Sequence, residues 1–174
     1  MKHYFRPYNN NRIFIETGTS TGDGVVAALN AGFPIIHSIE LSHYYYVMTQ
    51  KLFAKEKSVH LHFGNSLDIL PQLLKDINEP CTFWLDAHQC GGQAAGTLEE
   101  ILLMDELEII HNHHIKEHTI IIDDMRLVRD KTIDWKCFPY TQEDIEYVLS
   151  QINPKYKIHY EVGVVENDIL VARV

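Results

Sequence analysis

Short apolar runs alternate along the whole chain with segments whose apolar residues recur at helical spacing. This alternation predicts a parallel β-sheet covered by helices, and so an α/β fold. We expect helices near 23–30 and 44–53, after Ser66, from about 97 to 111, and after Thr141. We expect seven strands, at 12–16, 35–40, 59–63, 82–85, 119–122, 157–162 and 168–174. A turn at Asn167 separates the last two, which predicts a closing antiparallel hairpin.

Capping residues mark several of the expected helix starts. Ser42 precedes the helix at 44–53, and Thr97 with Glu100 has the spacing of a capping box. Thr141 and Asp144 have a similar spacing at the start of the last helix. These positions therefore predict where three of the helices begin.

Polar residues follow the first five expected strands. They are Glu16, Glu40, Asn65, Asp86, Asp123 and Asp124. In open α/β sheets, ligands bind at the carboxyl ends of the strands. A sequence selected for stability alone has little reason to repeat this pattern, so we expect a binding site at that edge of the sheet.

The segment E-T-G-T-S-T-G-D-G, residues 16–24, connects the first strand to a helix. Its glycines allow unusual dihedrals and close backbone approach, and the N–H groups of the helix start can receive a polar ligand group. Glu40 follows about twenty residues later, where an acceptor for ribose hydroxyls belongs. A plain glycine turn is the alternative for the segment taken by itself. With Glu40 in place, the pattern favours a nucleotide-like ligand.

Composition narrows the choice of protein class. The chain has 174 residues, which suggests a single domain over 1–174, and its net charge of −9 disfavours a broad nucleic-acid surface. No apolar run is long enough to span a membrane, and the N-terminus does not resemble a signal peptide. The three cysteines lack C-x-x-C spacing and indicate reduced thiols. We therefore expect a cytoplasmic protein without a membrane partner.

The ordered segments resemble those of class I S-adenosylmethionine-dependent methyltransferases. E-T-G-T-S-T-G-D-G is similar to their first motif, S-I-E-L to the second, and H-F-G-N-S-L-D-I-L-P to the third-strand segment. F-W-L-D-A-H and I-I-I-D-D resemble the fourth and fifth strand ends. The resemblance implies a Rossmann-like, doubly wound sheet of seven strands. It also implies S-adenosylmethionine as cofactor, bound by Glu16, Thr17, Gly18, Thr19, Gly22, Glu40, Asn65, Ser66 and Asp86.

Within that superfamily, the D-x-H and D-D segments look most like macrocin-type, metal-dependent O-methyltransferases. The resemblance implies that Asp86, Asp123 and Asp124 bind a divalent cation, and that His88 is the catalytic base. Carboxylates suit Mg²⁺, Ca²⁺ or Mn²⁺, and an imidazole can accept a hydroxyl proton near neutral pH. The expected reaction is methylation of a hydroxyl on a small molecule or sugar. A homo-oligomer that completes the acceptor pocket is a further expectation.

Other interpretations stay open at this point. The chain can be a non-catalytic or partner-dependent cofactor-binding module, because only about eleven residues precede the first strand. A nicotinamide-dependent oxidoreductase is disfavoured, because G-x-G-x-x-G is absent. The aspartates can also be structural. A zinc site of His88 and Cys90, with Cys81, lacks a second correctly spaced ligand pair.

Several histidines and aromatic residues have simpler expected roles. His111, His113 and His114 are predicted to form a solvated helix end, and Trp84 is predicted to lie in the core. Helical spacing places Tyr44, Tyr45 and Tyr46 on different sides of a helix, so at most two can approach an adenine. Trp135 and Phe138 lie in an irregular segment and are candidates for an acceptor contact.

Overall fold

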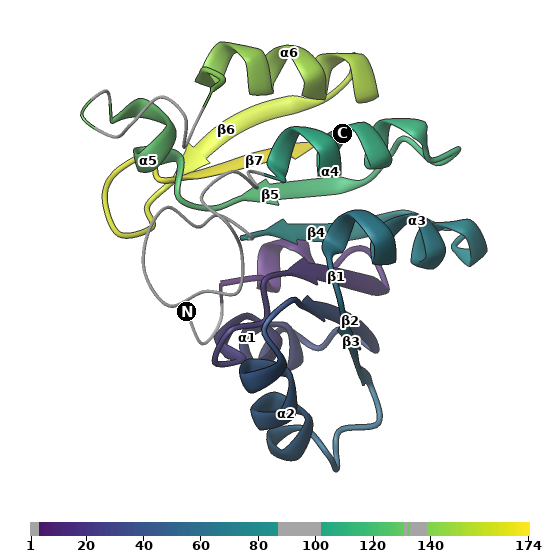
Figure 1. The fold of residues 1–174 in the computed structure, drawn as a ribbon. Coiled ribbons are helices and arrows are strands. Elements are labelled where there is room, and N and C mark those ends of the chain that lie inside the picture. Colours follow the sequence, from purple (N-terminus) through teal and green to yellow (C-terminus); the bar gives the residue numbers. More distant parts are fainter. Residues whose placement is uncertain (1–3, 87–101, 131, 133–138) are drawn as a thin grey trace.

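A seven-stranded sheet forms the centre of the computed structural model, in which residues 4–86, 102–130, 132 and 139–174 are described (Figure 1). The strands are β1 (Ile13–Thr17), β2 (Ile35–Glu40), β3 (Val59–Phe63), β4 (Cys81–Leu85), β5 (Thr119–Ile122), β6 (Lys157–Glu161) and β7 (Ile169–Arg173). Their order across the sheet is β3-β2-β1-β4-β5-β7-β6. Strands β1 to β5 pair in parallel, and β7 runs antiparallel to both β5 and β6. The expected α/β fold and closing hairpin are therefore confirmed.

Helices cover both faces of this sheet. They are α1 (Asp23–Ala31), α2 (His43–Leu52), α3 (Ser66–Asp76), α4 (Leu103–Asn112), α5 (Met125–Arg129) and α6 (Gln142–Ile152), with a short 3-10 helix, η1, at Arg6–Tyr8. Figure 1 shows α3, α4 and α6 side by side along one face. None of the helices that the structure describes is long and apolar enough to cross a membrane.

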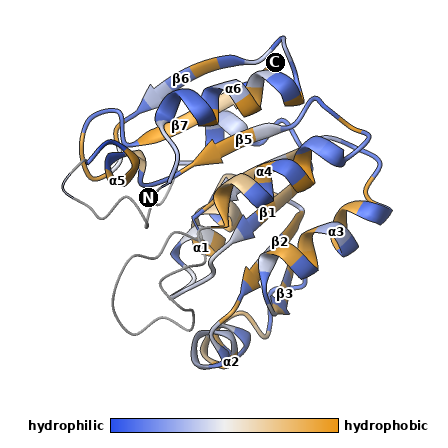
Figure 2. Ribbon diagram, turned by 45° about the horizontal axis from the view of Figure 1, so that its top comes forward, coloured by the Kyte–Doolittle hydropathy of each residue, from blue (hydrophilic) through white to orange (hydrophobic). Residues whose placement is uncertain are grey.

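Successive residues of each strand enter two separate hydrophobic cores. In β1, Ile13 and Ile15 pack with α3, α4 and α6, whereas Phe14 packs with α1 and the N-terminal segment around Phe5. Trp84 lies in the second core and is 1% exposed, as its sequence context predicted. Figure 2 shows the hydrophobic colour concentrated in the central strands, while the covering helices carry both colours. This two-sided burial explains why the central strands are almost wholly apolar.

Most element boundaries agree with the sequence patterns to within one or two residues. The predicted start of the last helix is confirmed as a capping box, in which Thr141 and Asp144 bond reciprocally. Ser42 is the N-cap of α2, but its side chain makes no capping hydrogen bond. Thr97 and Glu100 lie outside the described residues, and α4 is described from Leu103. Two short elements, η1 and α5, carry too little periodicity to be predicted.

The strand order reverses direction between β1 and β4. From β1 the chain builds β2 and β3 on one side, and it then returns to place β4 and β5 on the other. In open α/β sheets, ligands bind beside such a reversal, at the carboxyl ends of the strands. The fold thus places the loop after β1 beside the aspartates that follow β4 and β5.

Candidate active site

The loop after β1 is a fixed turn that brings the backbone close to its neighbours. Gly18 has a φ of 88°, and the N–H groups of Gly18 and Thr19 both donate to the carbonyl of Ile39, at 2.9 and 3.2 Å. Gly22 is the N-cap of α1 with a φ of 90°, and a Cβ there would stand 2.7 Å from the Phe53 ring. Both glycines therefore occupy positions that other residues enter only with strain.

The side chain of Glu16 is connected to this loop by hydrogen bonds. Its carboxyl group is buried, and its Oε2 accepts a hydrogen bond of 2.5 Å from Ser38 Oγ. Ser38 Oγ also lies 2.6 Å from Thr19 Oγ1, so the two side chains connect Glu16 to the loop. Burial raises the pKa of Glu16 to about 8, and the charges of Glu40 and Asp23 act in the same direction. Through Ser38 and Thr19, the buried Glu16 side chain supports the loop.

Glu40 ties the loop to the end of β2. Its Oε2 accepts the N–H of Ser20 at 2.7 Å, and its Oε1 accepts the N–H of Ser42 at 2.6 Å. Ser20 has a φ of 47°, an unusual conformation for a residue with a side chain. Glu40 lies next to the loop, as the sequence predicted, and in this structure it fixes the backbone at two points. A contact from Glu40 to a ribose stays a prediction.

The other residues predicted to bind cofactor have identifiable local roles. Asn65 Oδ1 accepts the N–H of Leu67 at 2.9 Å and caps α3, while Ser66 is the buried first residue of that helix. Thr17 Oγ1 donates to Glu106 Oε2 at 3.3 Å, on the face of the sheet that α4 covers. Thr17 therefore directs its hydroxyl towards α4.

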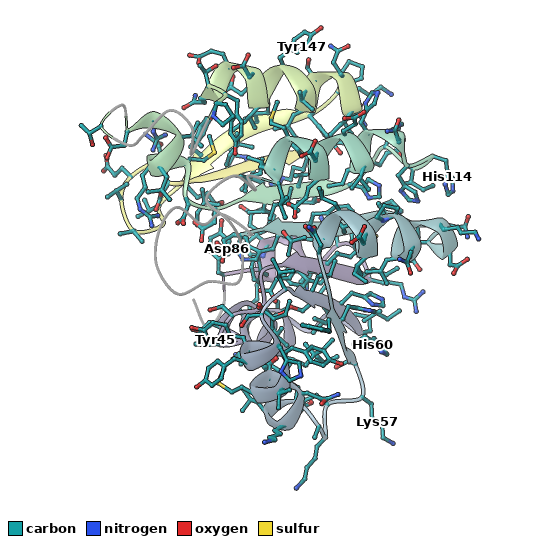
Figure 3. The ribbon with its side chains drawn as sticks, viewed as in Figure 1. Tyr45, Lys57, His60, Asp86, His114 and Tyr147 are labelled. Atoms are coloured by element: carbon teal, nitrogen blue, oxygen red, sulfur yellow. The ribbon has the colours of Figure 1, made fainter. Side chains whose placement is uncertain are left out.

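Three aspartates gather where β4 and β5 end. The N–H of Asp86 donates to the carbonyl of Thr17 at 3.2 Å, and the N–H of Asp123 donates to that of Leu85 at 3.2 Å. Burial raises the pKa of Asp86 to about 8, with further contributions from Asp123, Asp124 and then Glu16. Burial also raises the pKa of Asp123 to about 6. These side chains therefore share one region of negative potential next to the loop, and Figure 3 shows Asp86 at that edge.

Asp168 joins this region from the start of β7, and the sequence analysis missed it. In the described part of the chain, carboxylate oxygens of Asp123, Asp124 and Asp168 lie within 4.8 Å of one another, in a group that does not include Asp86. Asp168 is buried, and its oxygens accept the N–H groups of Arg126 and Val164 at 3.0 and 2.9 Å. Asp168 belongs to no short sequence motif at this site, because it reaches the other aspartates only through the pairing of β7 with β5.

The guanidinium of Arg126 lies between two of these aspartates. Its Nη1 is 2.5 Å from Asp124 Oδ1 and 2.6 Å from Asp168 Oδ2. Burial opposes ionisation of Asp168, but the two backbone N–H groups and Arg126 outweigh it and lower its pKa. Asp124 has a φ of 61°, so the backbone turns sharply here to start α5. Arg126 therefore compensates Asp124 and Asp168. Among the described residues, Asp86 and Asp123 form no ion pair.

Some predictions for side chains outside this site are corrected by the structure. His113 is buried: its Nδ1 lies 2.9 Å from His118 Nε2 and its Nε2 lies 3.0 Å from the Ile77 carbonyl. The prediction of a solvated helix end is therefore wrong for His113, because the chain turns towards α3 after Asn112. Of His111, His113 and His114, only His114 is exposed. Cys81 begins β4, about 16 Å along the strand from Asp86. It therefore lies too far from Asp86 for the two side chains to share an ion.

The predicted base His88 and the zinc candidate Cys90 lie outside the described residues, as do Trp135 and Phe138. The tyrosines of α2 divide as expected. Tyr44 is 71% exposed, and Tyr46 packs on Phe63 with 5.3 Å between ring centroids. Figure 3 shows Tyr45 on the same side of the molecule as Asp86.

No family model and no curated protein matches the sequence. Solved structures of methyltransferases, however, share the fold. The O-methyltransferase TomG from Streptomyces achromogenes, in complex with SAM, has a TM-score of 0.66 and 16% identity, over 98% of this chain and 76% of that chain. The O-methyltransferase from Bacillus cereus, in complex with SAH, has a TM-score of 0.68 and 16% identity, over 98% and 77%.

A human relative in the same comparison is methyltransferase-like protein 13 in complex with SAH, with a TM-score of 0.61 and 15% identity, over 93% of this chain and 71% of that chain. Each of these proteins differs widely from this chain in sequence but shares its architecture. The chain therefore has the Rossmann-like fold of the class I S-adenosylmethionine-dependent methyltransferases, closed by its antiparallel β7.

Proposed function

We propose that this chain is an S-adenosylmethionine-dependent methyltransferase that methylates a hydroxyl group of a small molecule or sugar with the help of a divalent cation. The observation that carries the proposal is the juxtaposition of two features at one edge of the sheet. The loop held by Glu16 and Glu40 lies beside Asp86, whose N–H bonds to the end of β1. TomG and the Bacillus cereus enzyme, which have this fold, are complexed with SAM and SAH.

The cofactor would lie over the loop after β1. Each oxygen of Glu40 accepts one backbone N–H and retains a second lone pair, which can accept a ribose hydroxyl. Gly18, Thr19 and Gly22 would allow the ligand to approach the backbone closely. Glu16, Thr17 and Ser66 are buried under this surface and would position it, while Asn65 and Asp86 border it.

The aspartates at the ends of β4 and β5 would supply the oxygen donors for a hard divalent cation such as Mg²⁺. Asp86 and Asp123 are crowded carboxyl groups whose pKa values are raised, which is the state that a cation would relieve. Asp124 would complete the set with the oxygen that Arg126 does not engage. When bound, the cation would lower the pKa of an acceptor hydroxyl and orient it.

The residues of the chain would then have three tasks. The loop holds the sulfonium cofactor, the aspartates hold the acceptor oxygen in line with its methyl group, and His88 accepts the hydroxyl proton. The C–S bond breaks as the C–O bond forms, which gives S-adenosylhomocysteine and a methyl ether, with the proton on His88. Because the cofactor already activates the methyl group, alignment is the main contribution of the protein.

Calorimetry with S-adenosylhomocysteine, with and without Mg²⁺, tests this proposal, together with S-adenosylhomocysteine release from S-adenosylmethionine over a panel of sugar and phenolic hydroxyls. We expect cofactor binding in both conditions and Mg²⁺-dependent turnover with at least one acceptor class. Asp124→Asn should abolish the Mg²⁺-dependent part of turnover. His88→Gln should lower turnover without lowering the affinity for the cofactor. The exposed Asp130→Asn is the control and should change neither quantity.

A non-catalytic cofactor-binding module is the competing function. Tight S-adenosylhomocysteine binding with no Mg²⁺ linkage and no turnover would support it, and absence of any cofactor binding would reject both.

A further inference from the structure

Three histidines share one face of the sheet at its β3 edge, opposite to the face of β2 that carries Ser38 and Glu40. His60 and His62 are two residues apart in β3, so their side chains point to the same face. In the parallel register, His37 of β2 lies directly beside His60. Because side chains alternate along a strand, the three histidines lie on the same face of the sheet as Ile35 and Ile39, next to α3. Figure 3 shows His60 on the side of the molecule away from Asp86.

The three imidazoles form a single cluster. His37 Nδ1 lies 3.0 Å from His62 Nε2, and the ring of His60 stacks on that of His37 with centroids 5.1 Å apart. The centroids of His37 and His62 are 5.2 Å apart. Two ring nitrogens that bind the same zinc ion at about 2.05 Å in tetrahedral geometry lie about 3.3 Å apart. The His37–His62 pair is therefore already close to the spacing of two zinc ligands.

We propose that His37, His60 and His62 bind a zinc ion, with water in the fourth position. Zinc would take the place of the hydrogen bond between His37 and His62, with the donor ring keeping its proton on its other nitrogen, and the exposed His60 would turn its ring to supply the third nitrogen. Imidazole donors select zinc or a similar borderline ion, in contrast to the carboxylates at the other site, which suit Mg²⁺.

The electrostatics of the cluster favour this use. Burial, followed by the neighbouring rings, lowers the pKa of His37 to about 4, and burial also lowers that of His62. Both rings are therefore neutral near pH 7, which is the form that binds metals. A zinc ion here would connect the edge strand β3 to β2 and so stabilise the end of the sheet, without contact with the methyl-transfer site.

Zinc titration of the chain without a histidine tag tests the site, by calorimetry and by side-chain NMR of the histidines. His60→Gln and His62→Gln each remove one ligand, and His114→Gln is the control because His114 is exposed outside the cluster. We expect one equivalent of zinc, at least roughly tenfold weaker binding in each ligand variant and no change in the control. The melting temperature of the wild-type chain should rise with zinc, and that of the ligand variants should not.

Equal zinc affinity in the wild-type chain, both ligand variants and the control would overturn the proposal, as would NMR shifts confined to histidines other than His37, His60 and His62. The NMR arm uses the wild-type chain and so remains decisive if a variant fails to fold. S-adenosylhomocysteine affinity should be the same in wild type and His60→Gln, so this test is independent of the proposed methyl transfer.

Discussion

Gly24 of α1 lies so close to Glu16 of β1 that a Cβ on the glycine would stand 1.7 Å from the carboxyl Oε1. The buried carboxyl group therefore packs directly on the helix backbone, and this contact sets how closely α1 approaches the sheet. Because α1 begins at the end of the cofactor loop, the same contact positions the loop.

Gly24→Ala should destabilise the fold, because the methyl group must displace Glu16 from its bond to Ser38. We expect a loss of about 2 kcal/mol in the free energy of unfolding, measured by urea denaturation. Gly24→Ala combined with Glu16→Ala should lose less than the sum of the two single variants, since the second change removes the atom in conflict. Strict additivity would show that the contact is not the cause.

Glu40→Gln should weaken cofactor binding through the backbone of the loop. A glutamine has one acceptor oxygen, so it cannot accept both the Ser20 and the Ser42 N–H groups as the carboxylate does. We expect roughly tenfold weaker binding of S-adenosylhomocysteine by calorimetry, since losing a charged hydrogen bond costs about 1.5 kcal/mol. The exposed Glu166→Gln is the matched control. Unchanged affinity in Glu40→Gln would contradict this role.

Arg126→Gln should leave Asp168 buried beside Asp124 without its cation, although the two backbone N–H bonds of Asp168 remain. We expect a loss of about 2 kcal/mol in the free energy of unfolding at pH 7. The lowered pKa of Asp168 stabilises the wild-type fold above the unfolded value of about 3.9, and this contribution is lost as the pH falls through the folded pKa.

The stability difference between wild type and Arg126→Gln should therefore narrow below about pH 4. Denaturation curves from pH 3 to 7 measure it, with Arg126→Lys as the charge-conserving comparison. A difference that is the same at every pH would mean that packing of the Arg126 stem, rather than charge, is lost.

His118 should make stability depend on pH through its buried position. Its Nδ1 accepts the N–H of Cys81 at 3.0 Å, and its Nε2 bonds to His113. Burial, followed by the charge of His113, lowers its pKa to about 3, from about 6.5 for an unperturbed histidine. The stabilisation from neutral His118 is thus complete above about pH 6.5 and is lost as the pH falls towards 3.

We expect His118→Gln to be about 2 kcal/mol less stable than wild type at pH 7, and the difference to shrink at pH 4. Thermal and urea denaturation at both pH values measure this, with the exposed His114→Gln as control. If the wild-type chain and His118→Gln lose stability in parallel between these pH values, His118 is not the titrating group.

The sequence by itself determined the alternation of elements and the edge of the sheet that carries the polar residues. Central parallel strands such as β4 and β5 are buried on both faces, which gives them uniform apolar runs. The strands at Ile35–Glu40 and Val59–Phe63 were also predicted to the residue. Glu16, Glu40, Asp86 and Asp123 could be singled out because each lies at or just after the end of a strand, and the carboxyl ends of parallel strands meet at one edge.

Only the tertiary structure decided which side chains meet across long stretches of chain. Asp168 reaches Arg126 because β7 returns antiparallel to β5, a pairing between residues far apart in sequence that leaves no local pattern. His113 is buried, and His37 lies against His62, for the same reason. Local hydrophobic periodicity fixes elements and faces, whereas the pairing of distant polar groups depends on strand register and packing, which no single segment encodes.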